Sequence, residues 1–222
     1  MVVKDCDFTV QKGEIIGLMG ESGSGKSTLA KLLIGLEKPS QGQVLLDGQP
    51  YSVKKSGVRI LLVFQDSLHS VNPHFTVEQV LTEALSKDVA RDEIEAILED
   101  VGLDKSYLTQ PARQLSGGQL QRICIARGLL LKPDVLIFDE ALSGLDPIVQ
   151  GRLLHLLYDL WEKYQLTYLF ISHDFKLSYA LCHRILVMAD GEIVDEIKDF
   201  ELPIQAHHPV TKKLIGDKGH FS

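Results

Sequence analysis

A glycine-rich segment near the start of the chain, Gly20-Glu-Ser-Gly-Ser-Gly-Lys-Ser-Thr28, restricts the possible folds more than any other feature. The apolar run Glu14–Met19 before it has the length of a strand, and the residues after it, Leu29–Ile34, continue as a helix. Glycines allow successive backbone N–H groups to turn inward around phosphate oxygens. A helix that begins near Lys26 also points the positive end of its dipole at the same place. This strand–loop–helix arrangement predicts an α/β fold with a site for nucleotide phosphates.

The segment matches the spacing G-x-x-x-x-G-K-[ST], in which the last two positions have defined chemistry. Lys26 can reach the β- and γ-phosphates, and the Ser27 hydroxyl can ligate Mg²⁺. The alternative is a plain turn rich in glycine and serine, which would not require a strand before it and a helix after it. The residues expected to bind the nucleotide are Gly20, Glu21, Ser22, Gly23, Ser24, Gly25, Lys26, Ser27 and Thr28.

Short β-branched runs alternate with amphipathic stretches along the chain, which is typical of a mostly parallel sheet. The helix with the clearest signals begins near Pro147, where Asp146 can cap it. Residues 76–132 contain no convincing strand. The predicted fold class is therefore α/β, a mostly parallel sheet with an inserted helical subdomain. The expected strands are Glu14–Met19, Gln43–Leu46, Arg59–Phe64, Asp134–Phe138, Thr167–Ile171, Arg184–Met188 and Glu192–Ile197, and the expected helices of the insertion are Thr76–Ser86, Ala90–Val101 and Gly117–Leu131.

The composition argues against several classes of function. The 23 basic and 30 acidic residues give a net charge of −7, which argues against broad DNA binding, so no nucleic-acid partner is expected. Three widely spaced cysteines, Cys6, Cys124 and Cys182, do not suit a disulfide framework or a four-thiolate zinc site. No apolar run approaches the roughly 20 residues that cross a bilayer, and the N-terminus has acids where a signal peptide is apolar. The adjacent His207 and His208 are more typical of solvated side chains than of a metal site.

A second candidate for chemistry is the pair of acids that ends the apolar run Asp134–Phe138. Open α/β sheets place their ligands at the carboxyl ends of strands. Asp139 is then positioned to hold the Mg²⁺ shell, and Glu140 to orient or deprotonate an attacking water. Two solvated acids at a strand end are the ordinary alternative, and the phosphate-binding segment earlier in the chain favours the functional interpretation.

Four further motifs follow in order: Phe64-Gln65-Asp66, Leu115-Ser116-Gly117-Gly118-Gln119, Ser143-Gly144-Leu145-Asp146 and Ile171-Ser172-His173-Asp174. Together with the two sites above, they resemble the Q-loop, signature, D-loop and switch histidine of the ATP-binding cassette (ABC) ATPases. The resemblance extends over residues 2–213. It implies a single domain over residues 1–222, with a RecA-like P-loop core and a helical subdomain at about residues 76–132.

The resemblance also implies an ATPase that uses ATP and Mg²⁺. The implied catalytic residues are Glu140, His173, Gln65 and Lys26, and the implied Mg²⁺ ligands are Ser27, Gln65 and Asp139. His173 would contact the γ-phosphate, and Gln65 would sense the metal and the attacking water. In this family the signature acts on the nucleotide of a second subunit, so the residues expected to bind ATP across a dimer are Ser116, Gly117, Gly118, Gln119 and Asp146.

The spacing of the motifs favours the transporter branch of the family. Only fifty residues separate Gln65 from Leu115, which leaves no room for the coiled coil of the DNA-repair members. Without a membrane span, the expected channel is a separate polypeptide, as in bacterial importers. The expected partners are integral membrane permease subunits, a second ABC ATPase (this chain or a related one) and, indirectly, an extracellular solute-binding protein. The expected location is the cytoplasmic face of the membrane.

Two segments resemble the dipeptide, oligopeptide and nickel branch of these importers. They are Gln65-Asp-Ser-Leu-His-Ser-Val-Asn-Pro73 and His208-Pro-Val-Thr-Lys-Lys-Leu214, which depart from the branch pattern at Ser67 and Val210. The start also departs from the family, because Val2–Phe8 resembles the segment that follows the usual adenine-stacking aromatic residue. The alternatives are an importer ATPase for another small solute, a soluble regulatory ABC ATPase, a non-hydrolytic binding module and a phosphotransferase.

Overall fold

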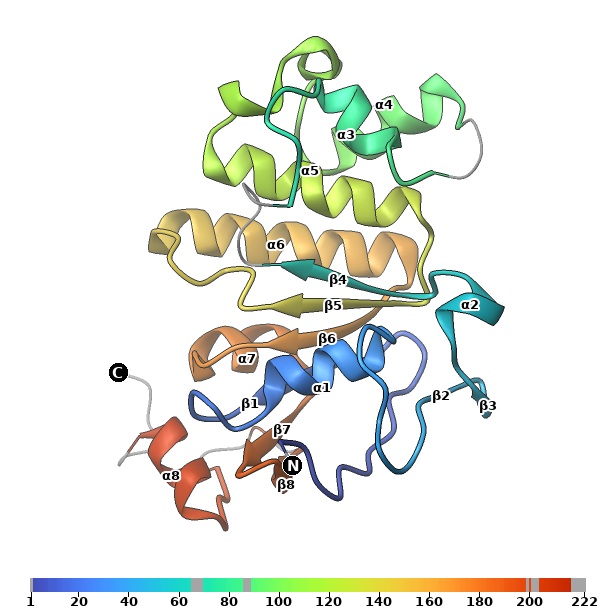
Figure 1. The fold of residues 1–222 in the computed structure, drawn as a ribbon. Helices are drawn as coiled ribbons and strands as arrows, with labels where there is room; N and C mark the ends of the chain where they lie inside the picture. The colour runs from blue at the N-terminus through green and yellow to red at the C-terminus, as the bar shows by residue number, and fades with distance from the viewer. Residues whose placement is uncertain (1, 65–69, 86–88, 199, 201–203, 217–222) are drawn as a thin grey trace.

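A twisted, mostly parallel sheet forms the centre of the molecule, as the computed structural model shows for residues 2–64, 70–85, 89–198, 200 and 204–216 (Figure 1). Its six strands are arranged in the order β4-β5-β6-β1-β7-β8, and β8 alone runs antiparallel to its neighbour. The strands are β1 (Ile15–Met19), β4 (Ile60–Phe64), β5 (Val135–Asp139), β6 (Thr167–Ile171), β7 (Arg184–Ala189) and β8 (Glu192–Ile197). The fold class and these six expected strands are confirmed to within one residue at each end.

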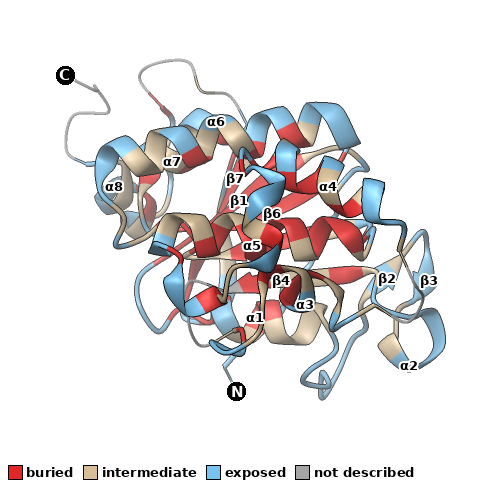
Figure 2. Ribbon diagram, turned by 90° about the horizontal axis from the view of Figure 1, so that it is seen from above, coloured by how far each residue is buried: buried red, intermediate tan, exposed pale blue. Residues whose placement is uncertain are grey.

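Both faces of the sheet are apolar, because alternate side chains of each strand enter different cores. On β1, Ile16 and Leu18 pack with Leu29 of helix α1 on one face, whereas Ile15 and Met19 belong to the core of the other face. That second face is covered by α5, α6 and α7 (Figures 1 and 2). The helices are α1 (Lys26–Leu33), α5 (Gly117–Leu130), α6 (Pro147–Tyr164) and α7 (Phe175–Leu181).

The described part of residues 76–132 has helices and turns, as the sequence predicts, although the first helix ends at Thr82, earlier than expected. Its apolar side chains extend the core that covers α5. Two of its helices begin with reciprocal capping boxes. Thr76 and Gln79 form one at the start of α3, and Ser116 and Gln119 form the other at the start of α5. Besides α5, this part of the chain contains α3 (Val77–Thr82), α4 (Arg91–Asp100) and two short 3₁₀ helices, Lys105–Thr109 and Ala112–Gln114.

A small hairpin lies outside the main sheet and corrects one expectation. The strand expected over Gln43–Leu46 is only two residues long, and it pairs with Gln49 and Pro50 after a two-residue turn instead of joining the central sheet. The turn between them is Asp47-Gly48, in which both residues have a positive φ, as a two-residue hairpin requires. The hairpin strands are β2 (Leu45–Leu46) and β3 (Gln49–Pro50), followed by the short helix α2 (Val53–Ser56).

Helix α8 (Pro209–Ile215) is the last described helix and lies beside the β7–β8 edge of the sheet (Figure 1). Within the described residues, no helix combines the length and the apolar character needed to cross a membrane.

The packing of α6 on the sheet can be tested at Leu157, whose side chain is completely buried. We expect Leu157→Ala to lower the free energy of unfolding by about 2–5 kcal/mol, because the cavity it leaves cannot collapse fully. Denaturant unfolding measures this loss. The control is His155→Ala on the exposed side of the same helix, which should change stability by less than about 0.5 kcal/mol. Equal losses in the two variants would contradict this packing.

Candidate active site

The segment between β1 and α1 forms a loop that wraps around the Lys26 side chain. Lys26 is buried, and its Nζ donates hydrogen bonds to the carbonyl oxygens of Gly20 at 2.8 Å and of Glu21 at 2.9 Å. Burial lowers the pKa of Lys26, although the nearby carboxylates of Glu140 and Asp139 oppose this effect. The loop therefore holds a desolvated cation where the sequence predicts phosphate oxygens.

Gly20 occupies a position that no other residue could take without strain. Its φ of 157° lies in the region that favours glycine, and a Cβ atom there would collide with the Met188 carbonyl oxygen and with Ser24 Oγ. The close approach of the loop to β7 thus depends on this glycine.

A cavity of about 380 Å³ opens beside the loop, at the carboxyl ends of β1, β5 and β6. This is within the usual volume of a small-ligand site. Most of its lining comes from positions named by the sequence motifs, together with Val2, which no sequence signal indicated. The lining residues are Val2, Ser22, Gly23, Gly25, Lys26, Ser27, Thr28, Asp139, Glu140 and His173.

Asp139 has the environment of a cation ligand. Burial raises its pKa, while a hydrogen bond with the Ser27 hydroxyl acts in the opposite direction. Its Oδ1 atom is buried and has no hydrogen-bond partner among the described residues. A buried carboxylate oxygen beside a hydroxyl matches the hard oxygen ligands that Mg²⁺ prefers. The residues present therefore fit the metal that the sequence predicts.

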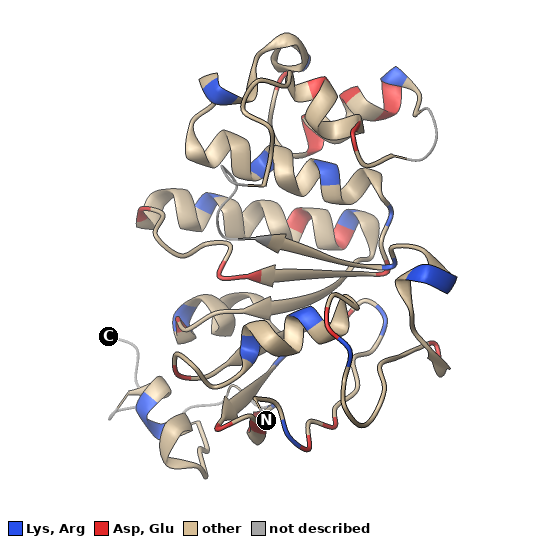
Figure 3. Ribbon diagram, in the orientation of Figure 1, with Lys and Arg blue, Asp and Glu red and all other residues tan. Residues whose placement is uncertain are grey.

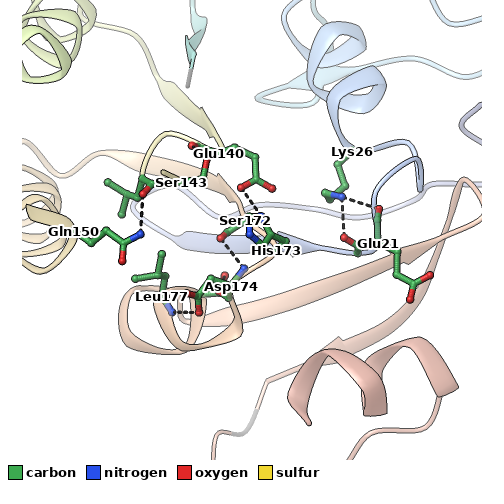
Figure 4. Close-up of polar contacts among 12 residues, drawn as sticks. Glu21, Lys26, Glu140, Ser143, Gln150, Ser172, His173, Asp174 and Leu177 are labelled. Atoms are coloured by element: carbon green, nitrogen blue, oxygen red, sulfur yellow. Dashed lines mark hydrogen bonds and ion pairs between the residues drawn. The ribbon is translucent and has the colours of Figure 1, made fainter. Parts of the chain in front are cut away.

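Glu140 and His173 meet at the mouth of the same cavity (Figure 4). Glu140 Oε2 lies 2.8 Å from His173 Nδ1, and the histidine side chain is 67% exposed. The contact follows from the sheet register, because Asp139 pairs with Ile171 and the next residues on both strands leave the sheet together. Glu140 has a φ of 52°, and its N–H donates to the Ile171 carbonyl oxygen. This left-handed backbone turns the end of β5 toward the cavity.

The signature residues lie apart from this cavity, since none of Ser116–Gln119 contributes to its lining. Ser116 caps α5 and is exposed, and Gln119 Nε2 donates to the Tyr107 hydroxyl at 2.9 Å. Asp146 caps α6 by accepting from the N–H groups of Ile148 and Val149, and it also lies outside the cavity lining. One copy of the chain therefore brings together the loop, Asp139, Glu140 and His173, but not the signature. Gln65 lies outside the described residues.

A lysine-containing phosphate loop at the end of a parallel strand, with an acid at the end of another strand of the same sheet, defines the class of P-loop nucleotide-binding proteins. Residues 3–143 match the ABC transporter family, so the chain belongs to that family. It is an ATP-binding cassette with ATPase activity.

Two curated relatives and one solved structure illustrate the match. The chain is 42% identical over 206 residues to the nickel import ATP-binding protein NikE of Shigella dysenteriae (strain Sd197), covering 87% of this chain and 77% of that protein. It is 38% identical over 221 residues to the metal-staphylopine import system ATP-binding protein CntF of Staphylococcus aureus (strain NCTC 8325 / PS 47), covering 96% and 88%. The solved structure is a dimeric, post-hydrolysis state of the ATP-binding cassette MJ0796 bound to ADP and Pi, with a TM-score of 0.74, 27% identity and coverage of 89% and 90%.

The steric role of Gly20 leads to a stability prediction. Gly20→Ala should lower the free energy of unfolding by about 1–3 kcal/mol, because the added methyl group meets backbone atoms that cannot move easily. Gly151→Ala is the control, since Gly151 lies within α6 and a Cβ atom there would meet open space. That change should stabilise the chain by about 0.5–1 kcal/mol. Thermal or denaturant unfolding of both variants measures the difference, and a neutral Gly20→Ala would contradict the close approach of the loop to β7.

Proposed function

We propose that this chain is the ATP-hydrolysing subunit of an importer for nickel, metal chelates or peptides, in which two cassettes close on ATP and drive separate membrane subunits. The observation that carries the proposal is the convergence of Lys26, Asp139, Glu140 and His173 on one cavity. The names of the two importer relatives and the His208–Leu214 segment support this choice of solutes.

Phosphate binding is the first step that the geometry supports. The Lys26 ammonium exchanges the carbonyl oxygens of Gly20 and Glu21 for oxygens of the β- and γ-phosphates, while N–H groups of the loop and of the first turn of α1 surround the remaining oxygens. Ser27 and Asp139 would hold Mg²⁺, which would supply charge neutralisation and orientation of the phosphates.

Glu140 is the residue best placed to orient and deprotonate the attacking water. It stands at the cavity mouth, and its contact with His173 fixes one carboxylate oxygen and leaves the other available. His173 then lies where it can contact the γ-phosphate. The proposal also includes Gln65 as a sensor of the metal and of the attacking water, because it lies in the motif that resembles the Q-loop.

The exposed N-terminus of the signature helix supports a site shared between two subunits. The first N–H groups of a helix lack intrahelical acceptors, and the side chain of Ser116 accepts only the one from Gln119. The N–H groups of Gly117 and Gly118 are left for the γ-phosphate bound to a second cassette, with Asp146 at the same interface. The dimeric neighbour bound to ADP and Pi supports this arrangement.

Transmission to the membrane is proposed to use the helical subdomain at residues 76–132. Arg127 on α5 donates to the Ser70 carbonyl oxygen at 3.0 Å and pairs with Glu83 at 2.8 Å. These contacts connect the signature helix to the segment that follows Gln65. Movement of the helices would therefore move that segment against permease subunits at the cytoplasmic face of the membrane. Copurification with integral membrane subunits separates this function from that of a regulatory ATPase.

The central test is Glu140→Gln, which should still bind ATP but lose at least a hundredfold in turnover, because the water loses its base. Phosphate release measures turnover, and light scattering with and without Mg-ATP measures the mass of the trapped species. An ATP-dependent dimer is the expected result. Glu99→Gln, an exposed change on α4, is the control and should hydrolyse ATP normally. Unchanged turnover in Glu140→Gln would remove Glu140 from its proposed role.

The two capping boxes allow a matched test of the signature. Ser116→Ala and Thr76→Ala each remove a cap with the same geometry, so both should lose about 1 kcal/mol of stability. Only Ser116→Ala should impair hydrolysis. Mixing it with Glu140→Gln should restore part of the phosphate release, because each mixed dimer would have one site that lacks both residues and one that has both. Independent, additive losses would contradict a shared site, as would equal effects of the two cap variants.

A further inference from the structure

Helix α8 is fixed to the edge of the sheet by one carboxylate. Asp195 on β8 accepts hydrogen bonds from Thr211 Oγ1 at 2.6 Å, from the His208 N–H at 2.8 Å and from the His207 N–H at 3.1 Å. Thr211 is completely buried. Although burial acts to raise the pKa of Asp195, these hydrogen bonds hold it below its ordinary value. The start of α8 therefore has a defined position on β8.

This position brings the second turn of α8 against the phosphate loop. Lys213 Nζ lies 2.5 Å from Glu21 Oε1, across 192 positions of sequence. Glu21 is the one acidic residue of the segment Gly20–Thr28. Figure 4 shows the Glu21 side chain pointing away from Lys26, and Figure 3 shows the basic stretch of α8 to which Lys213 belongs.

The side of the loop that carries Glu21 is therefore partly covered by α8. A small cavity of about 130 Å³ separates the two elements, with Val210 on one side and the loop residues Glu21–Ser24 on the other. Ser24 is buried, whereas Glu21, Ser22 and Gly23 remain exposed.

A carboxylate inside a phosphate-binding loop is electrostatically unfavourable. ATP carries several negative charges, and an unpaired Glu21 would repel them at short range. The Lys213 ammonium cancels that charge and also lowers the pKa of Glu21, so the carboxylate stays ionised and paired. Both side chains are largely exposed, which makes the effect sensitive to salt.

We propose that α8 is an accessory part of the phosphate site, in which Lys213 neutralises Glu21 and thereby raises the affinity of the loop for nucleotide phosphates. This rests on the proposed nucleotide binding by Gly20–Thr28. It assigns to Lys213 a role in binding affinity, and to Asp195 and Thr211 the role of positioning it.

The test is a titration of ADP and of Mg-free ATP into the purified chain. At about 20 mM ionic strength, Lys213→Ala should weaken ATP binding about two- to fivefold, and ADP binding less, because ADP carries less charge. At about 500 mM salt the loss should largely disappear, as expected of screened charges. Lys212→Ala is the control, since it removes the same charge from an adjacent exposed lysine that forms no ion pair among the described residues.

Two further variants separate the proposal from an ordinary surface ion pair. In a Glu21→Gln background, Lys213→Ala should have no further effect on affinity, because no carboxylate remains to be neutralised. In a Thr211→Val background, Lys213→Ala should also have little effect on ATP affinity, because α8 has lost a hydrogen bond that positions Lys213.

Equal losses in Lys213→Ala and Lys212→Ala would overturn the inference, and so would a loss that persists in the Glu21→Gln background. These outcomes leave the proposed function intact as long as the wild-type chain binds ATP. Failure of the wild-type chain to bind either nucleotide would instead overturn both proposals.

Discussion

The parallel pairing of β5, β6 and β1 is the constraint on which the candidate site depends. Parallel strands deliver their carboxyl ends to the same edge of a sheet, so the loops that follow all three strands meet there. The loop after β1 provides Lys26, the end of β5 provides Asp139 and Glu140, and the residue two beyond β6 is His173. A shift of β5 by one residue would turn Asp139 away from Ser27. The two apolar cores hold that register, since every strand of the centre is buried on both faces.

Much of this arrangement could be predicted from the sequence, for local reasons. The strands of the central sheet are short runs of β-branched and other apolar residues bounded by turn residues, and the start of α6 follows from Asp146 and Pro147. The phosphate loop could be predicted because its spacing and its flanking elements agree. The hairpin at Leu45–Leu46 is predicted less well, since two residues cannot show a period and the local signal is the turn Asp47-Gly48.

Other features depend on contacts between distant residues, and no local pattern contains them. The left-handed backbone at Glu140 results from how β5 and β6 end together, and the lining of the cavity by Val2 depends on the N-terminal segment lying beside Gly191, whose carbonyl oxygen accepts from the Lys4 N–H. The ion pair between Glu21 and Lys213 joins residues 192 positions apart in the sequence. The sequence motif around His208 resembles that of a family branch, and its physical basis is the hydrogen bond between Thr211 and Asp195. The prediction for Gln65 still awaits a test, because that residue lies outside the described part.

The two helix N-termini that can bind phosphate explain why a second copy is needed in the proposed mechanism. The N-terminus of α1 faces the cavity, whereas the signature helix α5 begins away from it, with Gly117 exposed and Gly118 half-buried. N–H groups without intrahelical acceptors favour an anion, and in the proposed mechanism the nucleotide of the same subunit binds at α1. A second nucleotide would then complete the site at α5. The chain would then provide one half of each of two sites, so closure depends on ATP in both. In the proposed mechanism, Lys26 sets the affinity of a single copy for ATP, and Lys213 adjusts it. That affinity is then the first determinant of how readily two copies close.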